Sequence, residues 1–333
     1  MNLKFLYLRQ EEVVKAGVLD FEAALKDIEE VLRMLARGEV EMPPKAGLEF
    51  FFPDGSQKGH ILAMPAYLRK LGIAGVKWAA GFFKNPELYS LPHGIDVVIL
   101  SDPESGRPLA IMDGTLITAV RTGSVAAVGA KYLSAGEVEV ASIIGAGVVG
   151  RAAAHAFEKA LPQLEEIRLF DLKADKAQLV AQETTKAKVV HSLEEAVKGS
   201  DVVVTATSSH NHFVKLSALK RDCVCVEVGK NEFEEAVILN ASRIVVDYWE
   251  QLKSREWVTL SRLVKQGLVS EDRIEEIADI VDDSSEAKCS GIRFFSPIGM
   301  ACEDIIVAHR LYHEALRKGI GAWLELWKEP LWS

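Results

Sequence analysis

The sequence has little of what marks several classes of protein. Four cysteines occur in 333 residues, and no two of them form a Cys-x-x-Cys pair. This pattern favours reduced core thiols over disulfides or a metal site, as is usual in the cytoplasm. The chain has no low-complexity tract and no Gly-x-Ser-x-Gly nucleophile elbow, and residues 1–8 are too short a run for a signal peptide or a membrane span. We therefore expect a cytoplasmic protein without a membrane segment.

An excess of positive charge is also missing. The chain carries 39 Lys and Arg against 48 Asp and Glu, a net charge of −9 that is spread along the sequence. This balance argues against nucleic acid or an anionic membrane as the main partner. With 333 residues, of which 49% are hydrophobic, the chain is long enough for two domains with separate cores.

The most informative feature that is present is a glycine motif in mid-chain. An apolar run over residues 140–144 passes directly into Gly145-x-Gly147-x-x-Gly150 and then into a helix-prone stretch. A second apolar run ends on Asp171, about 20 residues beyond the last glycine, which is the spacing of a dinucleotide-binding fingerprint. The motif predicts a dinucleotide site, with a tight turn that binds nothing as the alternative.

Each residue of this motif has a physical role in that prediction. Gly145 permits the tight turn, Gly147 lets backbone N–H groups approach a pyrophosphate, and Gly150 lets the helix pack closely on the strand. The helix N-terminus attracts the phosphates. Asp171 accepts hydrogen bonds from a ribose 2′-OH and repels a 2′-phosphate, so the expected cofactor is NAD(H) rather than NADP(H).

The hydrophobic pattern on either side of the motif predicts two domains of different class. An amphipathic helix is expected over residues 20–35, β-rich runs over 41–109, helices over 113–133 and 301–318, and alternating strands and helices between these two. We expect an α/β fold: a Rossmann-type doubly wound parallel sheet over 116–314, and an α+β substrate and dimerisation domain built from 1–115 and the tail 315–333.

Three cations lie in otherwise apolar settings of the N-terminal half. Lys45 follows a stiff Met-Pro-Pro segment, Lys77 interrupts an apolar strand, and Arg121 lies on or beside a small-residue helix. A buried cation needs a partner, which is either a substrate carboxylate, held best by the fork of an arginine, or an internal acid. Lys77, desolvated beside another cation, is a candidate proton donor or acceptor.

These motifs resemble those of the ornithine cyclodeaminase/μ-crystallin family, along nearly the whole chain. The matching stretches, in order and at family-like spacing, are Met42-Pro-Pro-Lys45, Met64-Pro-Ala-Tyr67, Gly75-Val-Lys-Trp78, residues 100–109, residues 112–123, residues 145–150, Thr205-Ala-Thr-Ser208 and residues 296–304. The resemblance implies a homodimer in which the N-terminal domain forms the subunit contact. It also implies a substrate held between the two domains.

The resemblance also implies roles for individual residues. Lys77 and Arg121 would contact the substrate, together with Ile298 and with Lys45, where family members often have an arginine. Cofactor contacts would fall on Arg121, Thr122, Gly145, Gly147, Val148, Val149, Gly150, Asp171, Thr207, Ser208, Gly229 and Ile298.

One departure from the family pattern bears on the reaction. Relatives that cyclise ornithine, and some that dehydrogenate alanine, carry an aspartate shortly after the glycine that ends the fifth strand, whereas here Asn231 takes that place in a shortened loop. An amide cannot take a proton from an ammonium at neutral pH. Glu232 and Glu227 are the acids that remain as substitutes, so Lys77, Asn231 and Glu232 are the candidate catalytic positions.

We therefore expect an NAD(H)-dependent oxidoreductase that acts on the C–N bond of a small L-α-amino acid or its imine. Two alternatives stay open: an ornithine cyclodeaminase that recycles NAD, and a non-catalytic, crystallin-like protein that binds a dinucleotide. No metal site is expected, because His309 and His313 have helical spacing but lack the glutamate of a zinc protease helix.

Overall fold

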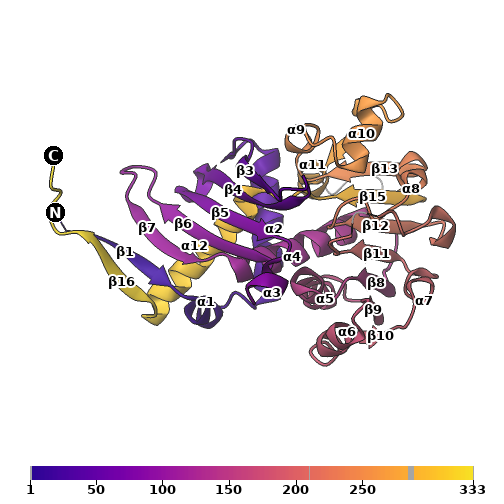
Figure 1. The fold of residues 1–333 in the computed structure, drawn as a ribbon, viewed down its shortest axis with the longest axis horizontal. Coiled ribbons are helices and arrows are strands. Elements are labelled where there is room, and N and C mark those ends of the chain that lie inside the picture. Colours follow the sequence, from indigo (N-terminus) through magenta and orange to yellow (C-terminus); the bar gives the residue numbers. More distant parts are fainter. Residues whose placement is uncertain (1, 210, 284–288, 333) are drawn as a thin grey trace. The chain divides into compact units, whose positions relative to one another are not determined.

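The computed structural model describes residues 2–209, 211–283 and 289–332. The chain divides into two compact units (Figure 1). The first, here the N-terminal unit, comprises Met1–Asp20, Arg37–Arg121 and Met300–Ser333. The second, here the dinucleotide unit, comprises Phe21–Ala36 and Thr122–Gly299.

The N-terminal unit is built on a mixed sheet in the order β16-β1-β7-β6-β5-β4-β2, with β3 also paired to β4. Neighbouring strands are antiparallel except for the parallel pair β1 and β7. The strands are β1 (Leu3–Leu8), β2 (Val40–Glu41), β3 (Ala46–Phe51), β4 (Gln57–Leu68), β5 (Ile73–Phe82), β6 (Gly94–Ser101), β7 (Pro108–Asp113) and β16 (Ala322–Trp327). The tail thus pairs with β1 of this unit as β16.

The helices of this unit are α1 (Gln10–Ala16), η1 (Arg69–Leu71), α3 (Asn85–Leu88), α12 (Ala301–Lys318) and the first turns of α4 (Thr115–Leu133). Helix α12 has the predicted bounds and packs against β4, β5 and β6. A Cβ on Gly75 would lie 2.6 Å from Ile305 of α12, so this glycine lets helix and sheet approach closely.

Cross-strand register gives this sheet one covered and one open face. The covered face includes a row of buried neighbours: Leu8, Met112, Val98, Lys77 and Met64. The next row is only half-buried or exposed: Tyr7, Ile111, Ile99, Val76 and Pro65. Because side chains alternate between faces along a strand, Lys77 points toward α12 while Trp78, 47% exposed, points to the open face.

The dinucleotide unit holds a sheet in the order β10-β9-β8-β11-β12-β15-β13-β14, in which each neighbouring pair is parallel. Its strands are β8 (Val140–Ile144), β9 (Glu166–Phe170), β10 (Ala187–Val189), β11 (Val202–Thr205), β12 (Cys223–Glu227), β13 (Ala241–Val246), β14 (Ile274–Glu276) and β15 (Ile292–Ser296). From β8 the chain runs outward to β10 and then crosses back to β11. This reversal makes the switch point of a doubly wound fold, where ligands bind at the carboxyl ends of the strands. The predicted fold class is confirmed.

The helices of this unit are α2 (Phe21–Ala36), the rest of α4, α5 (Val148–Ala160), α6 (Ala174–Ala181), α7 (Leu193–Val197), η2 (Leu216–Ala218), α8 (Glu235–Leu239), α9 (Trp249–Leu252), α10 (Thr259–Lys265), η3 (Glu271–Arg273) and α11 (Ile277–Asp282). Among the described residues, no helix is both long and apolar enough to cross a membrane.

The compact units differ from the expected domain bounds. Helix α2 groups with the dinucleotide unit because its apolar face packs on α5 and α11, a non-local contact that the sequence pattern does not reveal. Helix α12 groups with the N-terminal unit because it covers that unit's sheet, so the boundary falls at Met300 instead of 315. The other boundary falls inside α4, between Arg121 and Thr122, instead of at 116.

Candidate active site

The glycine motif forms the turn between β8 and α5 that the sequence predicted. Gly145 has φ +101°, a conformation that L side chains rarely adopt, and its N–H donates to the carbonyl of Phe170 at 2.8 Å. A Cβ on Gly150 would lie 1.8 Å from the carbonyl oxygen of Gly145. A Cβ on Gly147 would meet nothing within 4 Å, so the space beside the helix N-terminus is open. This turn therefore fits a pyrophosphate held by the N-terminus of α5.

Two side chains next to the turn bear on ligand binding. Asp171 follows β9, and its carboxylate accepts the N–H groups of Ala146 at 2.8 Å and Lys173 at 2.8 Å. The acid thus braces the glycine turn and lies where a ribose would be recognised. Val148, at the first position of α5, is 60% exposed, an unusual place for an apolar side chain unless a ligand covers it.

The remaining cofactor candidates lie at the carboxyl ends of the next strands. Thr207 and the exposed Ser208 follow β11, Gly229 follows β12, and the half-buried Ile298 follows β15. A Cβ on Gly145 would lie 2.5 Å from the carbonyl oxygen of Ala206, which places the β11 turn against the glycine motif. The structure therefore gathers these candidates, within the dinucleotide unit, on one edge of the sheet. Thr122 is separate from them in the chain and half-buried in α4.

The three candidates near the end of β12 differ in their contacts. The Asn231 side chain donates to the carbonyl of Trp257 at 2.9 Å and accepts the N–H of Thr259 at 2.7 Å, so it holds the loop in its left-handed conformation, φ +68°. Glu227 and Glu232 are completely buried. Glu232 accepts the hydroxyl of Thr207 at 2.8 Å, and Glu227 accepts the backbone N–H of Glu232 at 3.0 Å.

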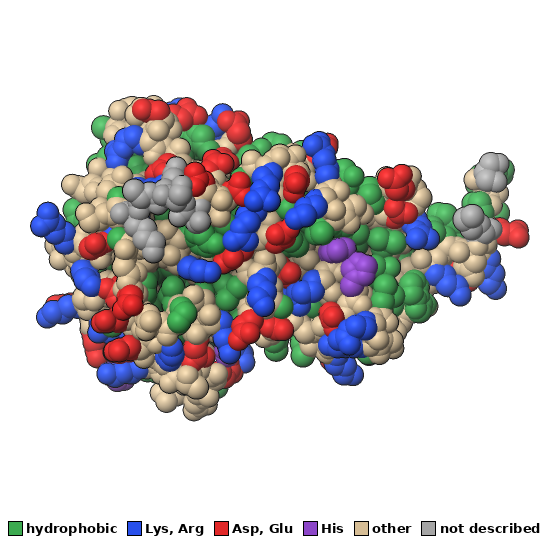
Figure 2. Space-filling model, turned by 180° about the vertical axis from the view of Figure 1, so that it is seen from behind, with side chains coloured by type: hydrophobic (Ala, Val, Ile, Leu, Met, Phe, Trp, Pro, Cys, Tyr) green, Lys and Arg blue, Asp and Glu red, His purple; other side chains and the backbone are tan. Residues whose placement is uncertain are grey.

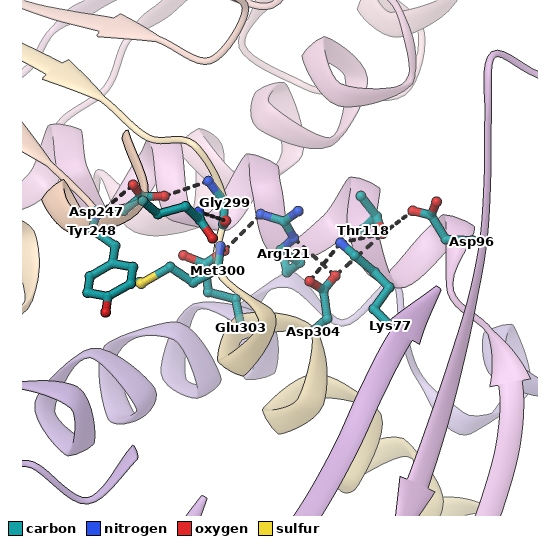
Figure 3. A network of polar contacts seen from close by, with 11 residues as sticks. Lys77, Asp96, Thr118, Arg121, Asp247, Tyr248, Gly299, Met300, Glu303 and Asp304 are labelled. Carbon is teal, nitrogen blue, oxygen red and sulfur yellow. Dashed lines mark hydrogen bonds and ion pairs between the residues drawn. The ribbon is translucent and has the colours of Figure 1, made fainter. Parts of the chain in front are cut away.

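The cations Lys77 and Arg121 lie buried in the N-terminal unit around one carboxylate (Figure 3). Asp304 contacts Lys77 Nζ with one oxygen at 2.7 Å and Arg121 Nε with the other at 3.1 Å. Arg121 Nη1 also pairs with Glu303 at 2.8 Å. Thr118 connects the cluster to Asp96, to which its hydroxyl donates at 2.5 Å. The internal acid that the sequence left as an alternative partner is therefore present.

Burial and mutual charge set the protonation of this cluster. Burial lowers the pKa of Lys77, and Arg121 lowers it further, against the opposing effect of Asp304 and Asp96. Burial alone would raise the pKa of Asp304, but Arg121 and Lys77 outweigh it, so this pKa is lowered. Burial raises the pKa of Asp96. Lys77 is thus an amine prepared to exchange a proton, beside an acid that stays ionised.

The guanidinium of Arg121 keeps one nitrogen available. Nε and Nη1 bind the two acids, and Nη2 has no acceptor among the described residues. Lys45 directly precedes Ala46, which pairs with Ala63, so the register places it beside Met64, the strand partner of Lys77. Lys45 is half-buried. The N-terminal unit therefore brings Lys77 and Arg121 together, and the register places Lys45 two strands from Lys77 on the same sheet.

Sequence reasoning missed four residues that complete this cluster: Asp96, Thr118, Glu303 and Asp304. A signal was available for two of them, because Glu303 and Asp304 interrupt a run of small and apolar residues at the start of α12. Asp96 alternates with apolar residues along β6, and its side chain lies on the face that carries Lys77.

Charged side chains and metal-ligating residues can also be surveyed over the described part of the chain. Figure 2 shows Lys and Arg side chains interspersed with Asp and Glu over the visible face. Within the described ranges, no group of three or more His, Cys, Asp or Glu residues is placed to hold a metal ion. His309 and His313 contact each other through their Nε2 atoms at 3.0 Å.

Comparison with known proteins agrees with this arrangement. The profile of the ornithine cyclodeaminase/mu-crystallin family matches residues 6–319. An alanine dehydrogenase from Archaeoglobus fulgidus is 32% identical over 345 residues, covering 98% of this chain and 100% of that protein.

Two solved structures are similar over nearly their whole length. A Thermococcus litoralis Δ1-pyrroline-2-carboxylate reductase, in complex with NADH and L-proline, has a TM-score of 0.85 at 27% identity, covering 96% of this chain and 99% of that one. An archaeal alanine dehydrogenase dimer with bound NAD has a TM-score of 0.86 at 30% identity, covering 98% and 100%. The predicted resemblance is confirmed, and the chain belongs to the ornithine cyclodeaminase/mu-crystallin family.

Proposed function

We propose that this protein is an NAD(H)-dependent oxidoreductase that acts on the C–N bond of a small L-α-amino acid or of its imine. The observation that carries the proposal is the joint attachment of Lys77 and Arg121 to Asp304, in a chain whose other unit has a dinucleotide-binding turn. The similar proteins support it, since one is an alanine dehydrogenase and another binds NADH and L-proline.

The side chains divide the work as follows. Arg121, fixed by Glu303 and Asp304, directs its free Nη2 to the substrate carboxylate, and Lys45 adds a second positive charge. Lys77 transfers the proton at the substrate nitrogen, because burial and Arg121 lower its pKa and so make its ammonium a readier proton donor. Bound NAD(H) supplies the hydride chemistry at the substrate Cα.

A cyclodeaminase would need a further base near the substrate amine. The amide of Asn231 is engaged with Trp257 and Thr259, and the second carboxylate oxygens of Glu227 and Glu232 are buried from solvent. These contacts support a plain oxidoreductase over the lyase. Ammonia and proline formed from ornithine with trace NAD would reverse this preference.

The proposal includes a homodimer in the cytoplasm. The open face of the N-terminal sheet presents Trp78 and Ile95, which are 47% and 39% exposed, among half-buried apolar neighbours, and a face of this kind is typical of subunit contacts. One similar structure is a dimer. Trp78→Asp should give monomers in light-scattering measurements, whereas an unchanged mass would contradict the dimer contact. The four cysteines, which include no Cys-x-x-Cys pair, support a cytoplasmic location.

The decisive experiment is a panel of amino acids with NAD, and of cyclic and open imines with NADH. Lys77→Met should lower kcat by more than about a hundredfold, the lower range for general acid–base catalysis, with the NADH dissociation constant unchanged. Lys70→Met, on an exposed turn, is the matched control. If no substrate of the panel reacted in either direction while NADH still bound, the result would favour the non-catalytic binding protein.

A further inference from the structure

Glu232 is the centre of a group of hydrogen bonds at the carboxyl ends of β11 and β12. Its backbone N–H donates to Glu227 Oε1 at 3.0 Å, and its carbonyl accepts the N–H groups of Phe213 and Val214 at 2.8 and 2.9 Å. Its side chain accepts the hydroxyl and the N–H of Thr207 at 2.8 and 3.3 Å. Glu232 thus connects the end of β12 with Thr207 and with Phe213 and Val214, which lie further along the segment that follows β11.

Gly229 makes room for this arrangement. A Cβ at that position would lie 1.8 Å from Glu232 Oε1, so the carboxylate lies directly against the backbone of the loop. The N–H of Gly229 donates to the carbonyl of Thr205 at 3.0 Å, which ties the loop to the end of β11. Any displacement of the Glu232 carboxylate therefore moves both the 229–231 loop and Thr207.

Among the described residues, neither carboxyl group has a cation as an ion-pair partner, although the charge of Glu232 acts on Lys230. Neither Glu227 nor Glu232 forms an ion pair with any residue that the structure describes, and the second oxygen of each is buried without a hydrogen-bond partner. The nearby titratable groups are Cys225 on β12, Lys230 on the loop and His212 on the segment after β11. Lys230 instead lies 4.5 Å from the centre of the Trp257 ring. A buried, unpaired carboxyl group is stable only when it carries a proton.

The position of this pair relates it to the dinucleotide. Asp171 marks the adenosine half of the fold, on the β8–β9 side of the switch point, so the nicotinamide half lies over β11 and β12. Thr207 and Gly229 are the residues at those two carboxyl ends. The Glu227–Glu232 pair lies beneath both.

We propose that Glu227 and Glu232 form a proton-dependent clasp, which holds Thr207 and the 229–231 loop in the conformation that binds the nicotinamide half of NAD(H), and that loss of its proton weakens this binding. Glu227 is a positioning residue in this proposal, which rests on the proposed dinucleotide site. The clasp opens because two neighbouring buried carboxylates repel each other, and this repulsion displaces the side chain that holds Thr207.

The electrostatics agree with this geometry. Burial raises the pKa of Glu227 to about 8, with the charge of Glu232 as the next cause. Burial also raises the pKa of Glu232, against the opposing hydrogen bonds from Thr207. The clasp is therefore closed at neutral pH and opens in mildly alkaline solution.

The test is a titration of NADH binding, by protein-to-nicotinamide energy transfer, from about pH 6 to about pH 9.5. In the wild type the dissociation constant should stay flat and then rise, by at most about tenfold per pH unit for one linked proton. Glu227→Gln keeps the size and the acceptor but cannot ionise, so its dissociation constant should stay flat throughout. An alkaline rise in Glu227→Gln equal to that of the wild type would overturn the clasp.

A second variant decides the matter if Glu227→Gln does not fold. Glu232→Gln likewise leaves a single carboxyl group that can ionise, so no repulsion between carboxylates can arise and the dissociation constant should again stay flat. An alkaline rise in Glu232→Gln equal to that of the wild type would overturn the clasp.

A matched control distinguishes the effect of the clasp acids on NADH binding from the effect of any other buried acid. Burial also raises the pKa of Glu276, whose carboxylate accepts the N–H of Trp249 at 2.8 Å and which takes no part in the clasp. Glu276→Gln should therefore keep the wild-type curve. Failure of the wild type to bind NADH at any pH would refute the proposed function itself. Binding with an identical pH curve in every variant would refute only the clasp.

Discussion

In the N-terminal unit, Lys77 and Arg121 lie buried with Asp304 and Glu303 as ion-pair partners, whereas in the dinucleotide unit the buried Glu227 and Glu232 form no ion pair with a described residue. The charges of the first cluster are neutralised by ion pairs. The carboxyl groups of the second cluster become neutral only when they bind a proton. The paired cluster should therefore depend on each of its members, and the carboxyl pair on the pH.

Removing the shared acid of the first cluster should have the largest effect. Asp304→Asn leaves two buried cations underneutralised, so we expect the free energy of unfolding to fall by about 3–5 kcal/mol, as when one partner of a buried ion pair is removed. Urea unfolding measures this change. Glu235→Gln breaks the half-exposed pair with Arg262 and should cost no more than about 1 kcal/mol. An equal decrease in the free energy of unfolding of both variants would show that the buried cluster stabilises the fold no more than an exposed ion pair does.

Crowding the second cluster should have the next largest effect. Gly229→Ala places a methyl group against the Glu232 carboxylate, and overpacking of this kind costs about 1–3 kcal/mol. Because the displaced side chain holds Thr207, NADH binding should weaken as well. Gly136→Ala, where a Cβ meets nothing within 4 Å, is the control. The geometry of the clasp would be wrong if both variants bound NADH as the wild type does.

The pH dependence of stability distinguishes the two clusters directly. The pKa of Glu227 is raised to about 8 in the folded state, above the ordinary value of 4.5. Between these values the folded protein binds more protons than the unfolded one, so the free energy of unfolding falls as pH rises, by at most about 1.4 kcal/mol per unit. Glu227→Gln should reduce this slope in urea unfolding at stepped pH. Identical slopes would assign the effect to other groups.

The smallest predicted effect concerns cofactor choice. Asp171→Ser removes the charge that repels a 2′-phosphate but keeps an oxygen that can accept the N–H of Ala146, so the turn should persist. The preference for NADH over NADPH should fall by about tenfold, which corresponds to a change of roughly 1.4 kcal/mol in relative binding free energy. Dissociation constants for both cofactors measure it, with the exposed Asp175→Ser as the control. A constant ratio would show that Asp171 only braces the turn.

Local features of the molecule could be predicted from the sequence. The turn at Gly145 and Gly150 and the position of Asp171 depend on short-range sterics and strand spacing, both of which are visible in a stretch of about 30 residues. The bounds of α12 followed from the hydrophobic pattern of residues 301–318. These predictions were confirmed.

Ion pairs and hydrogen bonds between residues that are far apart in the sequence could not be predicted. Arg121 and Asp304 are 183 positions apart, and nothing near either residue identifies the other. Lys77 and Arg121 were expected to be buried, but their shared acid became visible only when the sheet and α12 were in place. In the same way, Glu227 and Glu232 were weighed as separate candidate bases, because their common contact with the 207–214 segment depends on the pairing of β11 with β12.

The alternation along β5 makes the N-terminal unit intolerant of length changes. Lys77 faces α12 and Trp78 faces the opposite side only because Met64 pairs with Lys77 in the β4–β5 hairpin. One residue gained or lost in the connection between these strands, η1 and Gly72, would exchange the two faces: Val76 after a gain, or Trp78 after a loss, would replace the ammonium beside Asp304, and Lys77 would lie where a second subunit is expected. Evolution of new substrate preferences in this protein should therefore proceed by substitution, and insertions in this hairpin should be absent from active relatives.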